Sequence, residues 1–305
     1  MLNEPCFRRP ISPTLCVIAS TVLFAASQVH GQASAESRSW NQPVKPYHLI
    51  GNIYYVGASE VTSFLITTPE GHILLDSGYA ETLPQIKANV RELGFNLREI
   101  KILLNSHAHL DHCGGIAILK ALTGAQLIAS AADAELLTRG GLGDFHFGNE
   151  LSYAPVKTDR VLSDGEEVRL GGVTMTAHLT PGHTKGCTTW TMKVTEEGHV
   201  YDVVFVGSAS IPGYKLVNNQ QYPEITKDYA RTFRTLKTLP CDVFLASHGS
   251  FFSMTEKARL LAEHKTPNPF IDPQGYKNFV ARSEKEFQQQ LAREQKPTGA
   301  DIPPR

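Results

Sequence analysis

Residues 107–112 read His107-Ala108-His109-Leu110-Asp111-His112 and follow closely on residues 100–104, an apolar run that only Lys101 interrupts. A largely apolar run of that length is typical of a strand that is buried on both faces. In an extended segment, residues two apart project to the same side, so His107 and His109 can converge on one ion. The motif therefore places four possible metal ligands in six positions just after a buried strand.

Two further histidines occupy similar positions, because His183 and His248 each follow a β-rich run and stand next to glycine. Imidazole and carboxylate are typical zinc donors, and a catalytic zinc needs only three protein ligands, which leaves one position open for water. One ion cannot comfortably take all four donors of residues 107–112. Six donors instead divide into two sites of three, which suits two-metal hydrolysis with the ions about 3.5–4 Å apart.

The pattern around the motif alternates between the two kinds of secondary structure. Apolar periodicity predicts helices over residues 81–93, 115–122, 131–138, 225–239, 255–264 and 276–292. β-rich runs predict strands over residues 53–57, 63–67, 72–76, 100–104, 126–129, 168–170, 173–179, 188–194, 200–206 and 242–246. Strand groups followed by helices occur twice, which predicts an α/β protein with two sheets face to face and helices outside both. No repeat or linker is evident, so we expect residues 36–305 to form one domain.

The first 35 residues have the order of a secretory leader. Arg8 and Arg9 precede an apolar run at residues 15–26, and small and polar residues follow. The apolar run is too short to span a bilayer. We therefore expect cleavage near residue 27 or 35 and a periplasmic protein without a membrane anchor.

Composition limits the possible partners. The 305 residues are 41% hydrophobic and 19% charged, with a formal net charge of -1. A net charge so close to zero does not attract nucleic acid or an anionic membrane. We expect a monomer that acts on a small molecule. After the leader, the cysteines are Cys113, Cys187 and Cys241. At most one intramolecular disulfide can form, and buried thiols are the alternative.

The histidine motif, together with His183 and His248, resembles the signature of the metallo-β-lactamase superfamily. The similarity extends to subclass B3 β-lactamases and covers nearly everything after the leader. It is carried by the segments Trp40-Asn41-Gln42-Pro43, Gly51-Asn52-Ile53-Tyr54-Tyr55-Val56-Gly57, Gly182-His183-Thr184 and Asn268-Pro269-Phe270-Ile271-Asp272.

The resemblance implies an αββα sandwich with metal ligands on loops at one edge, and two zinc ions per chain. It assigns one zinc to His107, His109 and His183. It assigns the other to Asp111, His112 and His248. The implied activity is hydrolysis of the β-lactam amide by a metal-bound hydroxide that Asp111 orients, which would confer antibiotic resistance.

Position 208 separates the competing members of this superfamily. Glyoxalase II-like and lactonase-like members carry a bridging aspartate there, and subclass B1 and B2 β-lactamases carry a zinc-binding cysteine. This chain has Ser208, and serine is a poor zinc ligand. A serine at that position, with His112 as the replacement ligand, is the B3 arrangement.

By the same resemblance, Ser208 and Ser210 would bind the drug carboxylate, unless they merely cap a strand. Tyr214 would donate a proton toward the carbonyl oxygen or shape the pocket. Residues 140–148, with Phe145 and Phe147, would form a flap over the substrate, or their aromatic rings would only pack.

Two other functions remain possible at this point. The first is another hydrolase of the same fold, a lactonase or a glyoxalase II-like thioesterase, against which Ser208 argues. The second is a periplasmic zinc-binding protein without catalysis. Two sets of three ligands, each leaving a position open, argue against a purely binding role.

Overall fold

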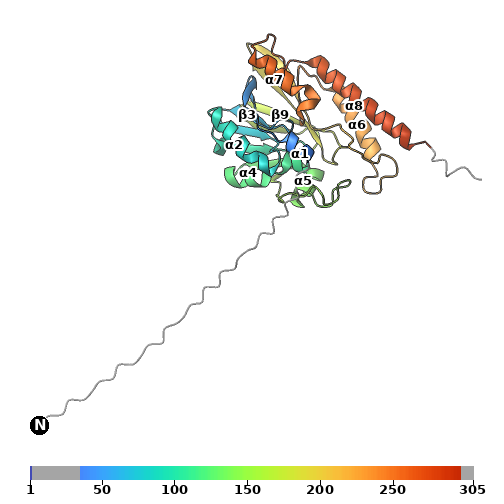
Figure 1. The fold of residues 1–305 in the computed structure, drawn as a ribbon, viewed down its shortest axis with the longest axis horizontal. Helices are drawn as coiled ribbons and strands as arrows, with labels where there is room; N and C mark the ends of the chain where they lie inside the picture. Colours follow the sequence, from blue (N-terminus) through green and yellow to red (C-terminus); the bar gives the residue numbers. More distant parts are fainter. Residues whose placement is uncertain (2–34, 297–305) are drawn as a thin grey trace, which may run out of the picture. The chain divides into compact units, whose positions relative to one another are not determined.

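Two β-sheets pack face to face in the described part of the chain, which comprises residue 1 and residues 35–296 of a computed structural model (Figure 1). The predicted leader falls almost wholly outside these residues. Among the helices that are described, none combines the length and apolar character needed to cross a membrane.

The first sheet has seven strands that lie side by side in chain order. They are β1 (Tyr47–Ile50), β2 (Ile53–Tyr55), β3 (Phe64–Thr68), β4 (Gly71–Leu75), β5 (Ile100–Leu104), β6 (Gln126–Ser130) and β7 (Arg160–Leu162). The strands β1 to β4 form an antiparallel meander, and β4 to β7 are parallel. Parallel neighbours need crossover connections, which contain α2 (Leu83–Glu92), α4 (Ile116–Thr123) and α5 (Ala131–Thr138).

The second sheet has five strands in the order β12 (Val243–Ala246), β11 (His199–Val206), β10 (Thr188–Glu196), β9 (Val173–Leu179) and β8 (Glu167–Leu170). Its strands are antiparallel except for β11 and β12, which are parallel and are connected through α6 (Ile225–Thr238). The remaining helices are α1 (Ala35–Trp40), α3 (Leu110–Cys113), α7 (Met254–Ala262) and α8 (Pro273–Glu294), with short 3₁₀ turns η1 (Ala80–Thr82), η2 (Leu97–Glu99) and η3 (Gly249–Phe252).

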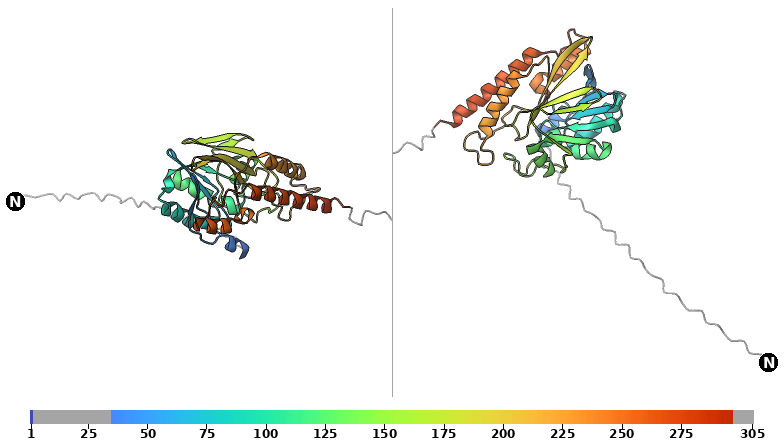
Figure 2. Two further views of the ribbon diagram at one scale, coloured as in Figure 1. Left: turned by 90° about the horizontal axis from the view of Figure 1, so that it is seen from above. Right: turned by 180° about the vertical axis from the view of Figure 1, so that it is seen from behind.

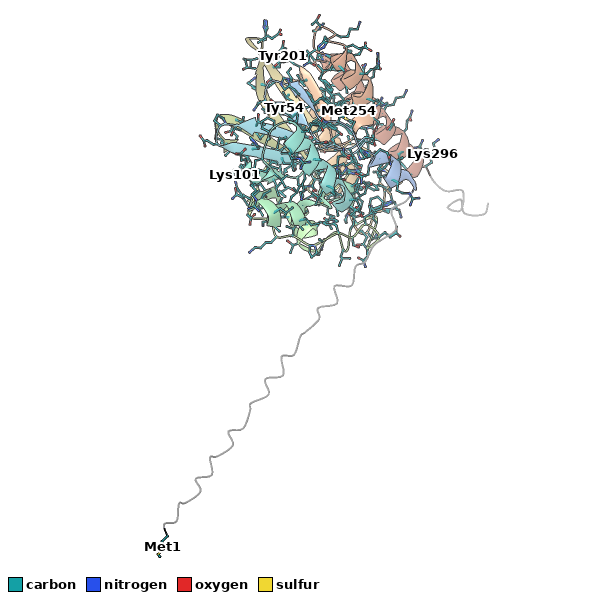
Figure 3. The ribbon with its side chains drawn as sticks, turned by 60° about the vertical axis from the view of Figure 1, so that its left-hand side comes forward. Met1, Tyr54, Lys101, Tyr201, Met254 and Lys296 are labelled. Atoms are coloured by element: carbon teal, nitrogen blue, oxygen red, sulfur yellow. The ribbon has the colours of Figure 1, made fainter. Side chains whose placement is uncertain are left out.

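The first sheet is buried on both faces. In β5, Ile102 and Leu104 belong to the core that also contains Trp190 and Phe205 of the second sheet. Leu103, between them, belongs to a separate core with residues of α2 and α4. Figures 1 and 2 show α2 and α4 on the opposite side of the sheets from α6 and α8, and Figure 3 shows side chains filling the space between the ribbons. Burial on both faces explains why residues 102–104, before the histidine motif, are all apolar, whereas Lys101 is exposed at the start of the strand. The predicted sandwich is confirmed.

The carboxyl ends of the strands that precede the histidines lie at one edge of the sandwich. In the second sheet, β9 and β11 are both antiparallel to β10 and so run in the same direction, and β12 is parallel to β11. Two hydrogen bonds join this edge to the first sheet: the Thr188 amide donates to Ser106 O at 2.8 Å, and the Thr62 amide donates to Ser247 O at 3.1 Å. The loops after β5, β9 and β12 therefore meet.

The three described cysteines, Cys113, Cys187 and Cys241, are free. Cys113 and Cys187 are buried, and burial raises the pKa of both thiols. The sequence left open a disulfide or buried free thiols, and Cys113 and Cys187 are buried free thiols.

Candidate metal centre

Three of the predicted donors, His107, His109 and His183, form one group with a ligand atom of each within 4.8 Å of the others. His109 Nδ1 lies 3.2 Å from His183 Nε2. The three residues are buried, and His107 Nε2 has no hydrogen-bond partner among the described residues. A buried polar nitrogen without a partner is costly, and a metal ion would satisfy it.

The other three donors, Asp111, His112 and His248, form a second group. The Oδ2 atom of Asp111 lies 3.1 Å from His112 Nε2 and 3.5 Å from His248 Nε2. The two ring nitrogens lie 3.2 Å apart. His107 is also within 4.8 Å of the Asp111 and His112 ligand atoms, so the two groups adjoin.

The local structure explains how one short segment supplies both groups. His107 lies in the link after β5, and His109 is the N-cap of the four-residue helix α3, with extended backbone angles. Asp111 and His112 lie inside that helix, where the chain direction has changed. The change from extended to helical backbone therefore directs His107 and His109 to one group and Asp111 and His112 to the other.

In each of the five rings, the nitrogen that faces away from the donors lies near an oxygen. These pairs are His107 Nδ1 with Ser106 Oγ at 3.0 Å, His109 Nε2 with Asp144 Oδ2 at 3.6 Å, His112 Nδ1 with Asp76 Oδ2 at 3.7 Å, His183 Nδ1 with Ser210 O at 3.0 Å and His248 Nδ1 with Glu60 Oε1 at 3.7 Å. The pairs with Ser106 and Ser210 are within hydrogen-bond distance, whereas the three carboxylates lie at ion-pair distance. Histidines that bind metals usually have an oxygen on this side, which sets the tautomer and the orientation of the ring.

The electrostatics favour the forms in which these side chains bind metals. Burial, together with the neighbouring rings, lowers the pKa of His107 and His183 well below the ordinary value, so both rings are neutral at pH 7. Burial also lowers the pKa of His248 to about 4. Burial alone would raise the pKa of Asp111, but His112 and His248 lower it further than burial raises it. His107, His183 and His248 therefore favour the neutral form and Asp111 the ionised form, as metal binding requires. The pKa of His112 is raised instead: burial lowers it, but the carboxylates of Asp111 and Asp76 raise it further.

Sequence reasoning missed Asp133, a buried carboxylate that connects the loops of the first group. Its Oδ2 atom accepts hydrogen bonds from the Ala108 amide and the Thr184 hydroxyl, both at 3.0 Å, and its Oδ1 atom accepts one from the Gly186 amide at 3.0 Å. Burial raises its pKa to about 6. Its place shortly after the predicted strand at residues 126–129 was a usable signal.

Asp76, Glu60 and Asp144 were also missed. Asp76 directly follows β4 and accepts a hydrogen bond from the Ser106 amide at 2.7 Å. Glu60 accepts one from the Ser250 amide. The position of Asp76 at the end of a predicted strand again marks the correct edge of the sheet, whereas Glu60 and Asp144 lie in loops that carry no such signal.

The residues predicted to bind substrate surround His183. Ser208 is buried, and its hydroxyl lies 3.2 Å from the hydroxyl of Ser210. The Ser210 hydroxyl lies 3.2 Å from His183 Nδ1. The buried Tyr214 donates from its hydroxyl to His183 O at 3.0 Å. All three therefore lie next to the first group of donors.

The loop at residues 140–148 packs its aromatic side chains on the same region. The Phe147 ring meets His109 edge to face with centroids 5.4 Å apart. The rings of Phe145 and His146 lie 4.9 Å and 4.6 Å from Tyr214. The loop thus contacts both a predicted ligand and a predicted substrate residue.

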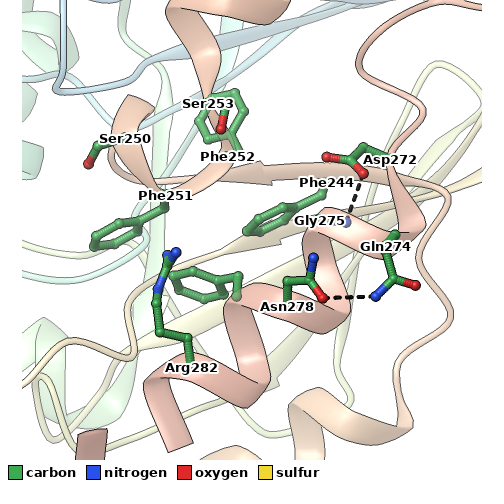
Figure 4. Close-up of a pocket in the computed structure, with 11 residues that line it drawn as sticks. Phe244, Ser250, Phe251, Phe252, Ser253, Asp272, Gln274, Gly275, Asn278 and Arg282 are labelled. Atoms are coloured by element: carbon green, nitrogen blue, oxygen red, sulfur yellow. Dashed lines mark hydrogen bonds between the residues drawn. The ribbon is translucent and has the colours of Figure 1, made fainter. Parts of the chain in front are cut away.

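A cavity of about 330 Å³ lies elsewhere, between η3 and α8 (Figure 4). Phe251, Phe279 and Arg282 are among the residues that line it, and none of the six predicted donors does. The predicted donors therefore lie on the loops at the edge of the sandwich and not in this cavity.

A family model described as the metallo-β-lactamase superfamily matches residues 56–248. The native FEZ-1 metallo-β-lactamase from Legionella gormanii is 42% identical, with a TM-score of 0.82, over 84% of this chain and 99% of that one. BJP-1, a subclass B3 metallo-β-lactamase of Bradyrhizobium japonicum, is 40% identical, with a TM-score of 0.78, over 84% of this chain and 96% of that one.

Curated relatives are more distant. A probable metallo-hydrolase of Burkholderia pseudomallei is 30% identical over 166 residues, which are 51% of this chain and 53% of the relative. The hydroxyacylglutathione hydrolase GloC of Haemophilus influenzae is 27% identical over 209 residues, 66% of this chain and 86% of the relative. The chain thus spans about half the length of the first of these relatives.

Proposed function

Because the chain belongs to the metallo-β-lactamase superfamily, we propose that it hydrolyses the amide bond of β-lactam antibiotics as a subclass B3 enzyme with two zinc ions. The observation that carries this proposal is the pair of adjoining donor groups, one of three histidines and one of Asp111, His112 and His248. Ser208 supports the subclass, since neither a carboxylate nor a thiolate stands at that position.

In this proposal the first group holds one zinc ion and the second group holds the other. When bound, such ions polarise a carbonyl group and lower the pKa of water. The neutral rings and the unpartnered His107 Nε2 fit this use. The adjoining positions of the two groups also fit a reaction in which both act on one substrate.

Asp111 has a second role in the proposed reaction. Its ionised carboxylate accepts a hydrogen bond from the attacking water and so directs the water oxygen toward the amide carbon. The reaction joins that oxygen to the carbonyl carbon, breaks the C–N bond and leaves a proton on the departing nitrogen. No side chain forms a covalent bond to the substrate.

Among the substrate residues, Ser210 is better placed than Ser208 to bind the drug carboxylate, because Ser208 is only 1% exposed and Ser210 is partly exposed. The Tyr214 hydroxyl already donates to His183 O. Of the two roles predicted for Tyr214, this contact favours shaping of the pocket.

A second candidate function is thioester hydrolysis, because several curated relatives are hydroxyacylglutathione hydrolases. Steady-state rates on a penicillin, a cephalosporin, a carbapenem, an acyl lactone and an acylglutathione distinguish the two. We expect kcat/KM for the best β-lactam to exceed that for the thioester by at least about 100-fold. Dialysis against a chelator should abolish β-lactam turnover, and zinc should restore it. Preference for the thioester or the lactone would contradict the proposal.

We also propose that the protein acts in the periplasm after removal of a leader. The support is the order of Arg8, Arg9 and the apolar run at residues 15–26, which lie outside the described residues. Amino-terminal sequencing of the protein from a periplasmic fraction tests this. A mature chain that still begins at Met1 would contradict it.

A further inference from the structure

Asp144 connects two parts of the molecule that the proposed reaction does not link. Its carboxylate is 5% exposed, and its Oδ2 atom lies 3.6 Å from His109 Nε2. Its other oxygen, Oδ1, accepts hydrogen bonds from the His146 and Phe147 amides, both at 2.8 Å. One oxygen therefore faces a predicted metal ligand while the other organises a turn of residues 139–150, here named the glycine loop.

His109 differs from the other histidines in the nitrogen that it presents to the donor groups. It approaches His183 through Nδ1, whereas His183, His112 and His248 make their donor contacts through Nε2. A neutral imidazole carries its proton on one nitrogen only, so His109 can bind a metal through Nδ1 only when the proton is on Nε2. A carboxylate beside Nε2 stabilises that tautomer.

The glycine loop combines contacts within itself with the packing of Phe145 and His146 on Tyr214. Asp144 and Gly148 form a short backbone pair, with N–O distances of 2.9 Å and 3.1 Å, and the Gly143 amide donates to Asn149 Oδ1. Gly148 has φ +60, a left-handed angle that favours glycine in this turn. The Phe147 ring packs edge to face with the His109 ring. The His109 ring therefore contacts both the Asp144 carboxylate and the Phe147 side chain of the loop.

We propose that Asp144 is a positioning residue that couples the glycine loop to the metal centre. It holds His109 in the tautomer whose Nδ1 faces the donor group. A metal ion bound by His109 in turn fixes the ring against which Asp144 and Phe147 hold the loop. This coupling rests on the proposed function, because it needs a metal at His109, and it extends that function to the loop whose Asp144 and Phe147 contact His109.

Coupling between two sites is reciprocal, so each half of the contact should respond to the other. Zinc should slow backbone hydrogen exchange in residues 139–150, and loss of the Asp144 carboxylate should weaken zinc binding at His109. Asp144→Asn is the informative change. The amide oxygen of asparagine can still accept the bonds from His146 and Phe147, but its NH₂ group donates toward Nε2 and favours a proton on Nδ1.

The test compares the wild type, Asp144→Asn and Glu150→Gln, with zinc alone as the probe. Glu150 is exposed and lies on the same loop, so it is a matched control. Competition with a chromophoric chelator measures zinc affinity, and hydrogen-exchange mass spectrometry measures protection of residues 139–150. We expect Asp144→Asn to weaken one zinc site by about 10–100-fold and to remove the zinc-dependent protection. Glu150→Gln should match the wild type in both measurements.

The outcomes separate this inference from the proposed function. No zinc binding by the wild type would overturn both together. Zinc binding by the wild type without slower exchange in the loop would overturn the coupling alone, as would Asp144→Asn with unchanged affinity. If Asp144→Asn does not fold, the ¹⁵N shifts of His109 in the zinc-bound wild type decide the tautomer, and a proton on Nδ1 would contradict the proposal.

Discussion

The two donor groups are built in different ways, although they adjoin. In the tri-histidine half (His107, His109 and His183), every residue is at most 7% exposed. In the aspartate half (Asp111, His112 and His248), the side chains of Asp111 and His248 are 16% and 14% exposed. The tri-histidine half is therefore more enclosed, and the aspartate half is more accessible to water.

The halves also differ in charge. The rings of the tri-histidine half have two neutral oxygen partners, from Ser106 and Ser210, and one carboxylate, from Asp144. The aspartate half contains a carboxylate donor, and both of its rings have carboxylate partners, from Asp76 and Glu60. One half thus offers imidazole donors alone, and the other adds the negative charge of a carboxylate. The two should respond differently to chelation and to substitution.

Removal of metal should have the largest effect. We expect about two zinc ions per chain at saturation, and complete loss of β-lactam turnover in excess chelator, since no covalent side chain can replace the metals. The more exposed aspartate half should release its ion first. Metal analysis and the time course of zinc transfer to a chromophoric chelator check this. One ion at saturating zinc, or a single phase of release, would contradict the expected difference between the two halves.

Asp111→Asn should have the next largest effect. It removes the charge of the donor group and the acceptor that directs the water, so kcat/KM should fall by at least about 100-fold. His107→Ala removes only a neutral donor, and excess zinc should restore part of its activity. Zinc titrations of turnover for both variants provide the measurement. Equal and complete rescue would show that Asp111 serves only as a ligand.

Glu60→Gln tests how much a carboxylate beside a donor ring contributes to zinc affinity, as distinct from a donor itself. The Glu60 carboxylate lies behind His248 and is partly exposed, so solvent weakens its effect. We expect zinc affinity of the aspartate half to fall by up to about tenfold, with the tri-histidine half unchanged. Chelator competition that resolves two dissociation constants tests this. A loss confined to the tri-histidine half would reverse the assignment of Glu60.

Ser208→Ala should have the smallest effect on metal binding, because a hydroxyl is not needed as a donor in either half. Zinc content should stay near two per chain. Ser208→Cys should redistribute the second metal, since a thiolate would compete with His112. Metal analysis of both variants decides between these expectations. Loss of one zinc in Ser208→Ala would show that Ser208 is a ligand and would rule out the subclass B3 arrangement.

The fold could largely be predicted because its strands and helices have strong local patterns. Apart from the exposed Lys101, β5 is apolar because both faces of the strand are buried, and α6 shows its buried side at Tyr229, Phe233 and Leu236. The strands β1 and β7 were not predicted. They have four and three residues, and β7 exposes Val161, so neither is long enough to show a period.

The types of the six predicted donors and their places along the chain could be read from the sequence, because these side chains follow strands whose apolar patterns are local. The oxygens that face the outer ring nitrogens became evident only in the folded structure. Asp76, Glu60 and Asp144 face the outer nitrogens of His112, His248 and His109 from distant loops. A contact between distant loops leaves no periodic signal in either segment. It exists because two sheets pack with their ligand-bearing edges together, and that packing is a property of the whole chain.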